Sequence, residues 1–71
     1  MSDLIKRSFS LAGHRTSVAL EPEFWRALEA LSEQRSQSLA AFIAVIDAER
    51  LPERPLASVL RVTALIAVRP I

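Results

Sequence analysis

The side chains that could do chemistry in this chain are few, and their types argue against catalysis. The sequence has 71 residues with no Cys and a single His, His14, so it offers neither a thiol nucleophile nor a cluster of histidines for a metal. Gly13 is the only Gly, which rules out a glycine-rich phosphate-binding loop. The carboxylates fall at predicted helix caps or exposed helix positions. We therefore expect no enzyme, no metal and no cofactor.

The groups that remain are hydrogen-bond donors and cations near the N-terminus. Residues 1–20 carry Lys6, Arg7 and Arg15 against one Asp, a net charge of +2, whereas residues 21–35 carry a net charge of −2. The whole chain is close to neutral at +1, so it would attract a polyanion only weakly through its total charge. The distribution of charge therefore favours the N-terminal segment as the binding surface.

Two short extended segments, residues 6–11 and 14–20, flank Gly13. Polar and apolar residues alternate in both with the two-residue period of a strand. In the second segment the two faces are Thr16, Val18 and Leu20 on one side and Arg15, Ser17 and Ala19 on the other. One face is therefore expected in the core and the other in solvent. The sequence leaves open whether the two segments pair as a hairpin.

A first helix is predicted over residues 22–35. Pro22 suits the first helical position, and acidic residues beside it complement the positive end of the helix dipole. Its apolar stripe is Phe24, Ala27, Leu28 and Leu31. Trp25 is expected at the edge of this stripe, and packing in a core or dimer interface is favoured there over stacking on a nucleic-acid base.

A second helix is predicted over residues 39–50, with Ser38 as its N-terminal cap. One stripe consists of Leu39, Phe42, Ile43 and Ile46, but Val45 and the alanines at 40, 41 and 44 make nearly the whole circumference apolar. A small chain with one strand and two helices cannot cover such a helix. We therefore expect the same helix of a second chain to cover it, in a homodimer.

A third helix is predicted over residues 56–68, after Pro52 and Pro55. The apolar run at 62–68 is far shorter than the ~20 residues that span a bilayer, so no membrane segment is expected. The N-terminus also lacks the apolar stretch of a signal peptide, so the protein is expected in the cytoplasm. The expected divisions are an N-terminal arm or extra strand at 1–13, a central domain at 14–50, and a linker and helix at 51–71.

The order of elements in residues 15–50, RTSVALEPEFWRALEALSEQRSQSLAAFIAVIDAER, resembles the ribbon-helix-helix family. The segments AGHRTSVALEPEFW, SLAAFIAVID and LASVLR are similar to a group of short bacterial proteins with predicted domains of this kind. The resemblance implies a mainly α fold with a short β-ribbon, an intertwined homodimer with an extra C-terminal helix, and DNA binding in transcriptional control. One departure is Ser36, which stands where such turns often have Gly.

In ribbon-helix-helix proteins such as Arc and MetJ, one strand from each chain pairs antiparallel and enters the DNA major groove. The resemblance therefore implies that Arg15, Ser17 and Ala19 face the bases. Arg15 would donate two hydrogen bonds to guanine, a contact worth ~1–3 kcal/mol of discrimination, while Ser17 would bond to a base edge and Ala19 contact a thymine methyl. The alternative is that Arg15 and Ser17 only solvate the outer face of the strand.

Phosphate contacts are expected at two further places. Ser38 and the first amides of the second helix, at Leu39 and Ala40, would hold a phosphate, although Ser38 as a cap alone explains its presence. Lys6 and Arg7 would bind neighbouring phosphates, with solubilising terminal charges as the alternative. His14 is expected as a polar strand end rather than a ligand.

A second hypothesis makes the protein an interaction or antitoxin-like module that binds a partner protein through residues 51–71. A face of Leu56, Val59 and Leu60 left in solvent would favour such a partner. The same face packed back on the domain would make the tail structural. DNA binding and partner binding are compatible with each other.

Overall fold

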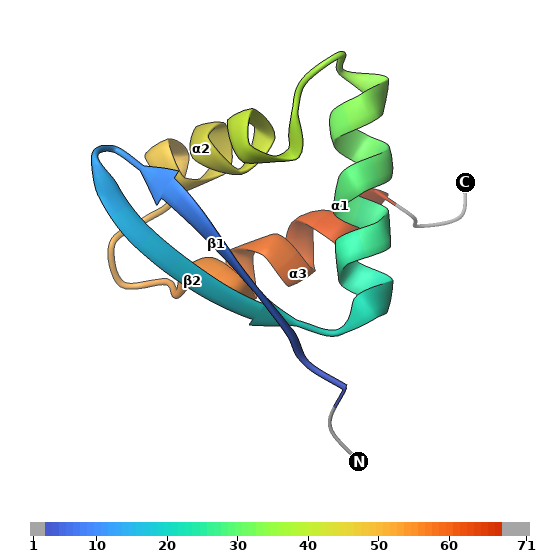
Figure 1. The fold of residues 1–71 in the computed structure, drawn as a ribbon, viewed down its shortest axis with the longest axis horizontal. Coiled ribbons are helices and arrows are strands. Elements are labelled where there is room, and N and C mark those ends of the chain that lie inside the picture. Colours follow the sequence, from blue (N-terminus) through green and yellow to red (C-terminus); the bar gives the residue numbers. More distant parts are fainter. Residues whose placement is uncertain (1–2, 68–71) are drawn as a thin grey trace.

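The computed structural model describes residues 3–67, which form a two-stranded antiparallel hairpin followed by three helices (Figure 1). The elements are β1 (Ile5–Leu11), β2 (His14–Leu20), α1 (Pro22–Gln34), α2 (Leu39–Glu49) and α3 (Leu56–Ala67). The predicted ribbon, both helices after it and the extra C-terminal helix are thus confirmed. Residue 68, the expected end of α3, lies outside the described residues.

The two strands pair with each other through a two-residue turn. Ala12 and Gly13 have φ values of 51° and 81°, as required by the hairpin turn whose twist matches that of paired strands. Leu11 pairs with His14, and the register continues to Ile5 opposite Leu20. The ribbon is therefore complete within one chain, whereas the resemblance had implied one strand from each of two chains.

The inner face of the hairpin closes a core to which all three helices contribute. The buried apolar side chains are Phe9, Leu11, Val18, Leu20, Trp25, Leu28, Phe42, Ile43, Leu56, Leu60 and Ala64. Burying a large apolar side chain contributes ~1.5–3 kcal/mol to the free energy of folding, so this cluster supplies the main stabilising term. The strands alternate as predicted, because Thr16 is partly buried and Val18 and Leu20 are buried on the same face.

Helix α1 is rotated relative to the predicted stripe. Trp25 and Leu28 are buried, whereas Phe24 and Leu31 are only partly buried, so the expectation that Trp25 lies at the edge is wrong. Trp25 is 1% exposed, and its indole Nε1 donates to the carbonyl oxygen of Ile5 at 2.8 Å. The physical reason is β1, which the hairpin brings against this helix and which provides a partner for the indole N–H.

The turn between α1 and α2 is ordered by backbone hydrogen bonds. The N–H of Gln37 donates to the carbonyl of Ser32 at 2.9 Å, and the N–H of Ser36 donates to that of Glu33 at 3.0 Å. This is the Schellman pattern, which requires a left-handed residue after the helix. Ser36 takes that conformation with φ 55°, at the position where the sequence analysis noted a missing Gly.

Helix α2 is covered on one side by its own chain. Phe42 and Ile43 are buried, and β1, α1 and α3 all contact the helix. Val45, however, is 45% exposed, so the sequence expectation of burial on several sides is only partly met within one chain. None of the helices described between residues 3 and 67 is long and apolar enough to cross a membrane.

Candidate nucleic-acid interface

The outward side of the hairpin carries six side chains from both strands. This outer hairpin face consists of Lys6, Ser8 and Ser10 from β1 and Arg15, Ser17 and Ala19 from β2. All are exposed except Ala19, which is partly buried, and they alternate with the core residues of each strand. The register pairs Lys6 with Ala19, Ser8 with Ser17, and Ser10 with Arg15. The face is therefore two residues wide and three residues long.

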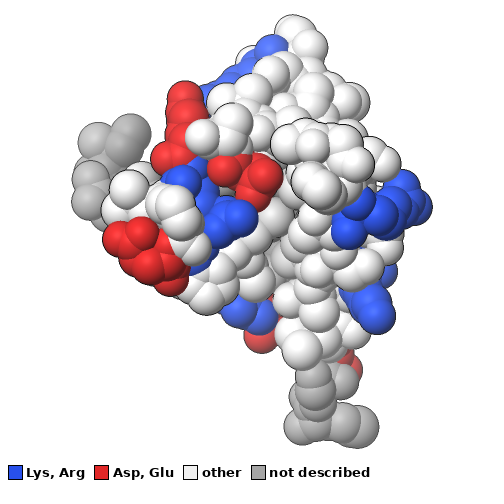
Figure 2. All heavy atoms as spheres, turned by 90° about the vertical axis from the view of Figure 1, so that its left-hand side faces the viewer, with Lys and Arg blue, Asp and Glu red and all other residues white. Residues whose placement is uncertain are grey.

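The outer hairpin face is polar and carries no negative charge. Its centre holds hydroxyl groups, its two cations Lys6 and Arg15 stand at opposite ends on different strands, and none of its six side chains is acidic. At a rise of ~3.3 Å per residue, the cross-strand pair that contains Lys6 lies about 13 Å along the ribbon from the pair that contains Arg15. Figure 2 views the molecule from the side of the hairpin turn. At the right-hand margin of the picture two basic groups have no acidic side chain between them, whereas acidic and basic groups are mixed on the left.

The hydroxyl groups of this face form a short hydrogen-bonded row. Ser8 Oγ and Ser17 Oγ lie 2.9 Å apart across the strands, and Arg15 Nη1 donates to Ser10 Oγ at 3.4 Å. The second contact is at the outer limit of hydrogen-bond geometry and is exposed, so a ligand can displace it at little cost. Ser8 and Ser10 were missed by the sequence analysis, although the alternation over residues 6–11 would have found them once a hairpin was assumed.

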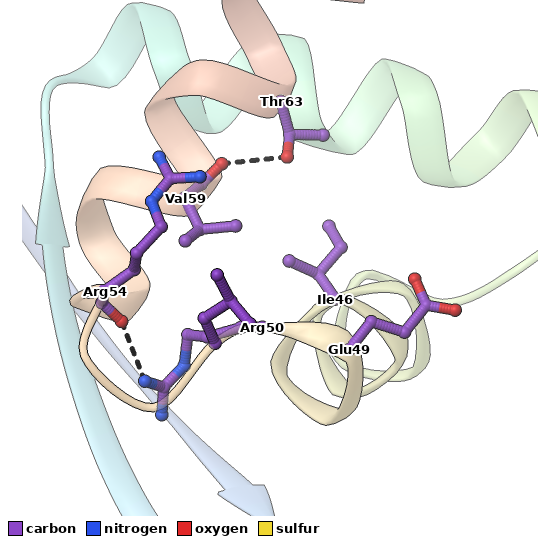
Figure 3. A pocket seen from close by; sticks show the side chains of 7 residues that line it. Ile46, Glu49, Arg50, Arg54, Val59 and Thr63 are labelled. Carbon is purple, nitrogen blue, oxygen red and sulfur yellow. Dashed lines mark hydrogen bonds between the residues drawn. The ribbon is translucent and has the colours of Figure 1, made fainter.

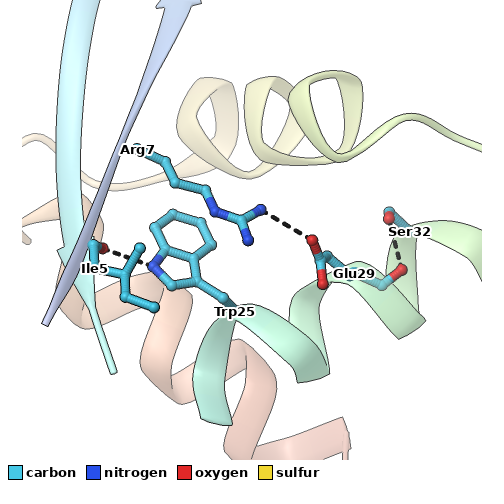
Figure 4. A network of polar contacts seen from close by, with 5 residues as sticks. All are labelled: Ile5, Arg7, Trp25, Glu29 and Ser32. Atoms are coloured by element: carbon cyan, nitrogen blue, oxygen red, sulfur yellow. Dashed lines mark hydrogen bonds and ion pairs between the residues drawn. The ribbon is translucent and has the colours of Figure 1, made fainter. Parts of the chain in front are cut away.

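Arg7 lies on the opposite side of the hairpin from Lys6, because consecutive strand residues point to opposite faces. Its Nη1 is 2.9 Å from Glu29 Oε2, and its guanidinium carbon is 4.9 Å from the centroid of the Trp25 ring (Figure 4). Both charged side chains of the pair are over a third exposed, so the ion pair adds at most ~1 kcal/mol to stability. Arg7 thus joins β1 to α1 and is not part of the outer hairpin face.

The start of α2 is separate from the outer hairpin face. Ser38 Oγ accepts a hydrogen bond from the Ala41 N–H at 3.1 Å, so the predicted cap is present. The amides of Leu39 and Ala40 make no hydrogen bond to the described part of the chain. In Figure 1 this end of α2 lies toward α1, away from the turn between β1 and β2. His14 is exposed at that turn.

The C-terminal helix packs back on the domain. Leu56 and Leu60 are buried and Val59 is partly buried, so of the two arrangements considered for this face the structure has the packed one. Helix α3 is also tied to the start of α1, since Arg61 Nε donates to Glu21 Oε1 at 3.1 Å. A backbone hydrogen bond and this contact with Arg61 lower the pKa of Glu21. Residues 56–67 are therefore a structural part of the domain.

The family model for the ribbon-helix-helix domain matches residues 4–68, which include both strands and all three helices. No curated protein and no solved structure matches the chain. The match covers far more than half of the 71 residues. The chain therefore belongs to the ribbon-helix-helix domain family.

Proposed function

We propose that this protein is a sequence-specific DNA-binding regulator of transcription that acts as a homodimer, with the outer hairpin face inserted into the major groove. Ribbon-helix-helix domains are in general DNA-binding, non-enzymatic regulatory modules, which supports this class of function. The observation that carries the proposal is the outer hairpin face itself, a two-stranded ribbon with two cations, three hydroxyls and no carboxylate. A ribbon of this width fits the ~12 Å major groove.

The bases are read by Arg15 at one end of the face, by the serines and by Ala19 at the other end. Arg15 donates two hydrogen bonds to the O6 and N7 atoms of a guanine, and Ser17 bonds to a neighbouring base edge. Ser8 and Ser10 stand beside them on β1 and offer further hydroxyls to the same groove. Ala19 contacts a thymine methyl group. Small side chains favour this role because they let the ribbon backbone approach the groove floor.

Phosphate contacts position the ribbon without reading sequence. Lys6 is exposed at the far end of the face and reaches a phosphate at the groove edge. The unbonded amides of Leu39 and Ala40, with Ser38, bind a second phosphate at the positive end of α2. Arg7 is left out of this set because Glu29 already neutralises it. Bound over a promoter in the cytoplasm, such a protein acts as a repressor or autoregulator.

Fluorescence anisotropy at several salt concentrations tests the proposal. The wild-type chain, Arg15→Ala and the control Arg26→Ala are titrated against a duplex selected from a random library and against random duplex. Arg26 is an exposed arginine of α1 outside the outer hairpin face, so it removes the same charge elsewhere. We expect Arg15→Ala to lower the preference for the selected duplex by about tenfold or more, as the loss of one bidentate base contact requires.

Two results would contradict the proposal. Absence of binding to either duplex at low salt would remove DNA as the ligand. An equal loss of affinity for both duplexes in Arg15→Ala would reduce Arg15 to a phosphate contact, because phosphate contacts carry no sequence information.

A further inference from the structure

The two strands of the hairpin repeat each other in sequence. Residues 6–11 read KRSFSL and residues 15–20 read RTSVAL, so a shift of nine positions places a cation on a cation, Ser on Ser, and core residues on core residues. Arg7 and Thr16 are the dissimilar pair. Burial repeats in the same order along both segments, except that Ser10 is exposed and its counterpart Ala19 is partly buried. Strand β1 is therefore a second version of β2.

The register of the hairpin turns this repeat into a pseudo-two-fold axis. Ser8 and Ser17 form the middle pair of the two strands. Because the strands are antiparallel, a two-fold axis through this pair, perpendicular to the ribbon, relates each residue of β1 to the residue nine positions later. Lys6 is thus related to Arg15, and the two serine hydroxyls, 2.9 Å apart, exchange places. The outer hairpin face of one chain therefore has the symmetry that a ribbon built from two chains would have.

The cations between α2 and α3 do not extend this arrangement. Arg50 Nη1 donates to the Arg54 carbonyl oxygen at 2.8 Å at the hollow between these helices, which Glu49 also lines (Figure 3). Arg50 Nε is also 3.0 Å from Asp47 Oδ1. Acidic and basic groups are therefore mixed at this hollow, which does not favour binding of a polyanion. The symmetric pair of cations belongs to the outer hairpin face.

Duplex DNA can match this symmetry. The symmetry of a palindromic site mirrors the two-fold symmetry of the protein that binds it. When the pseudo-two-fold axis of the hairpin coincides with the axis of such a site, Lys6 and Arg15 lie over equivalent base pairs in its two halves. Both Lys and Arg bond to the O6 and N7 atoms of guanine. The Lys6 ammonium has three donors, so a guanine contact is compatible with the phosphate contact proposed for it.

We propose that the hairpin of one chain reads a short palindromic DNA element, with Arg15 on a guanine of one half, Lys6 on the equivalent guanine of the other half, and the Ser8–Ser17 pair at the centre. The inference rests on the proposed function and adds to it the symmetry of the DNA element and a base-reading role for Lys6. Two chains that each read one half would instead use Arg15 twice and Lys6 in neither half.

Replacement of the guanine in one or both halves of the element tests the assignment. The wild-type chain, Arg15→Ala, Lys6→Ala and the control Arg26→Ala are titrated by fluorescence anisotropy against the element selected from a random library, with circular dichroism to confirm folding. The wild type and the control should lose affinity at the first replacement and again at the second, about fivefold or more each time. Each hairpin variant should tolerate the first replacement, since its remaining cation can bind the intact half, and should lose affinity at the second.

A gain of affinity provides an independent test. The fork of an Arg side chain bonds to guanine at two atoms, whereas Lys is a point charge. Lys6→Arg should therefore bind the palindromic element about threefold or more tightly than the wild type does, and the gain should disappear when one guanine is replaced. The substitution keeps the charge, so a gain that depends on both guanines cannot come from electrostatic attraction alone.

Three results would overturn the inference and leave the proposed function in place, because the selected duplex would still be preferred over random duplex. The selected element is not palindromic, or Lys6→Ala responds to the two replacements as the wild type does. In the third, Arg15→Ala tolerates both replacements, which would mean that Arg15 of two chains reads the two halves. Absence of binding to any duplex at low salt would overturn both the inference and the proposed function.

Discussion

Adjacent residues of β1 show how strongly position on a strand decides the role of a side chain. Lys6 is exposed on the outer hairpin face, whereas Arg7 contacts Trp25 and Glu29 on the other side. The sequence analysis grouped the two as phosphate contacts because it did not fix which way each residue of 6–11 faces. It placed Arg15, Ser17 and Ala19 correctly on one face, because alternation over seven residues is a local signal.

Ser36 gives a stability prediction at the scale of one residue. A non-glycine residue in the left-handed conformation costs ~1–2 kcal/mol, and Gly removes this cost while gaining freedom in the unfolded chain. Ser36→Gly should therefore raise the free energy of unfolding by about 0.5–1 kcal/mol, measured by urea denaturation. Ser36→Ala keeps the Cβ and serves as the control. If the Gly variant were no more stable than the Ala variant, Ser36 would not carry backbone strain.

Glu21 gives a pH prediction. The lowered pKa means that its contribution to stability is present above the usual pKa of a Glu and is lost as the pH falls through the lowered value. Arg61→Gln removes one of the two groups responsible, so the pKa of Glu21 should rise toward its usual value. NMR titration of the side-chain carboxyl carbon measures the shift. An unchanged pKa in the variant would mean that Arg61 and Glu21 do not interact in solution.

At the scale of elements, the helix starts followed directly from local sequence, and so did the buried Phe42 and Ile43 of α2, but the buried face of α1 did not. Pro22 and Ser38 mark the starts of α1 and α2 as predicted. The buried side of α1, however, includes Trp25 and Ser32. Ser32 is polar and satisfies itself by donating to the Glu29 carbonyl at 2.8 Å. No helical pattern of apolar residues could reveal this face, because β1, which covers Trp25, is about twenty residues away in the sequence.

Helix α3 gives a prediction about packing. Leu60 is fully buried and Leu65 is 63% exposed on the same helix. Leu60→Ala should lower the free energy of unfolding by about 2–5 kcal/mol through lost burial and a cavity, whereas Leu65→Ala should change it little. Chemical denaturation of both variants at one low protein concentration makes the comparison. Equal effects would show that α3 does not pack on the domain as described.

At the scale of the whole molecule, the protein separates two surfaces with different chemistry. The outer hairpin face is polar and cationic, whereas the helices leave the large apolar side chains of Val45, Leu65 and Ile66 exposed. A complete ribbon within one chain means that a single protomer can present the whole reading face. A homodimer would link two such faces and raise their joint affinity for a two-part site. The sequence analysis expected a second chain to cover α2; within one chain β1, α1 and α3 cover part of that helix, and Val45 stays 45% exposed.

The most direct test of the central claim is an NMR titration of the isotopically labelled chain with the selected duplex. Amide signals of Ser8, Ser10, Arg15 and Ser17 should shift or broaden first, followed by those of Leu39 and Ala40, and random duplex should shift them less. Signals of residues 56–67 that face away from the hairpin should change little. If the changes instead fell on α3 and spared the hairpin, or if no signal moved at low salt, the outer hairpin face would not be the DNA-binding surface.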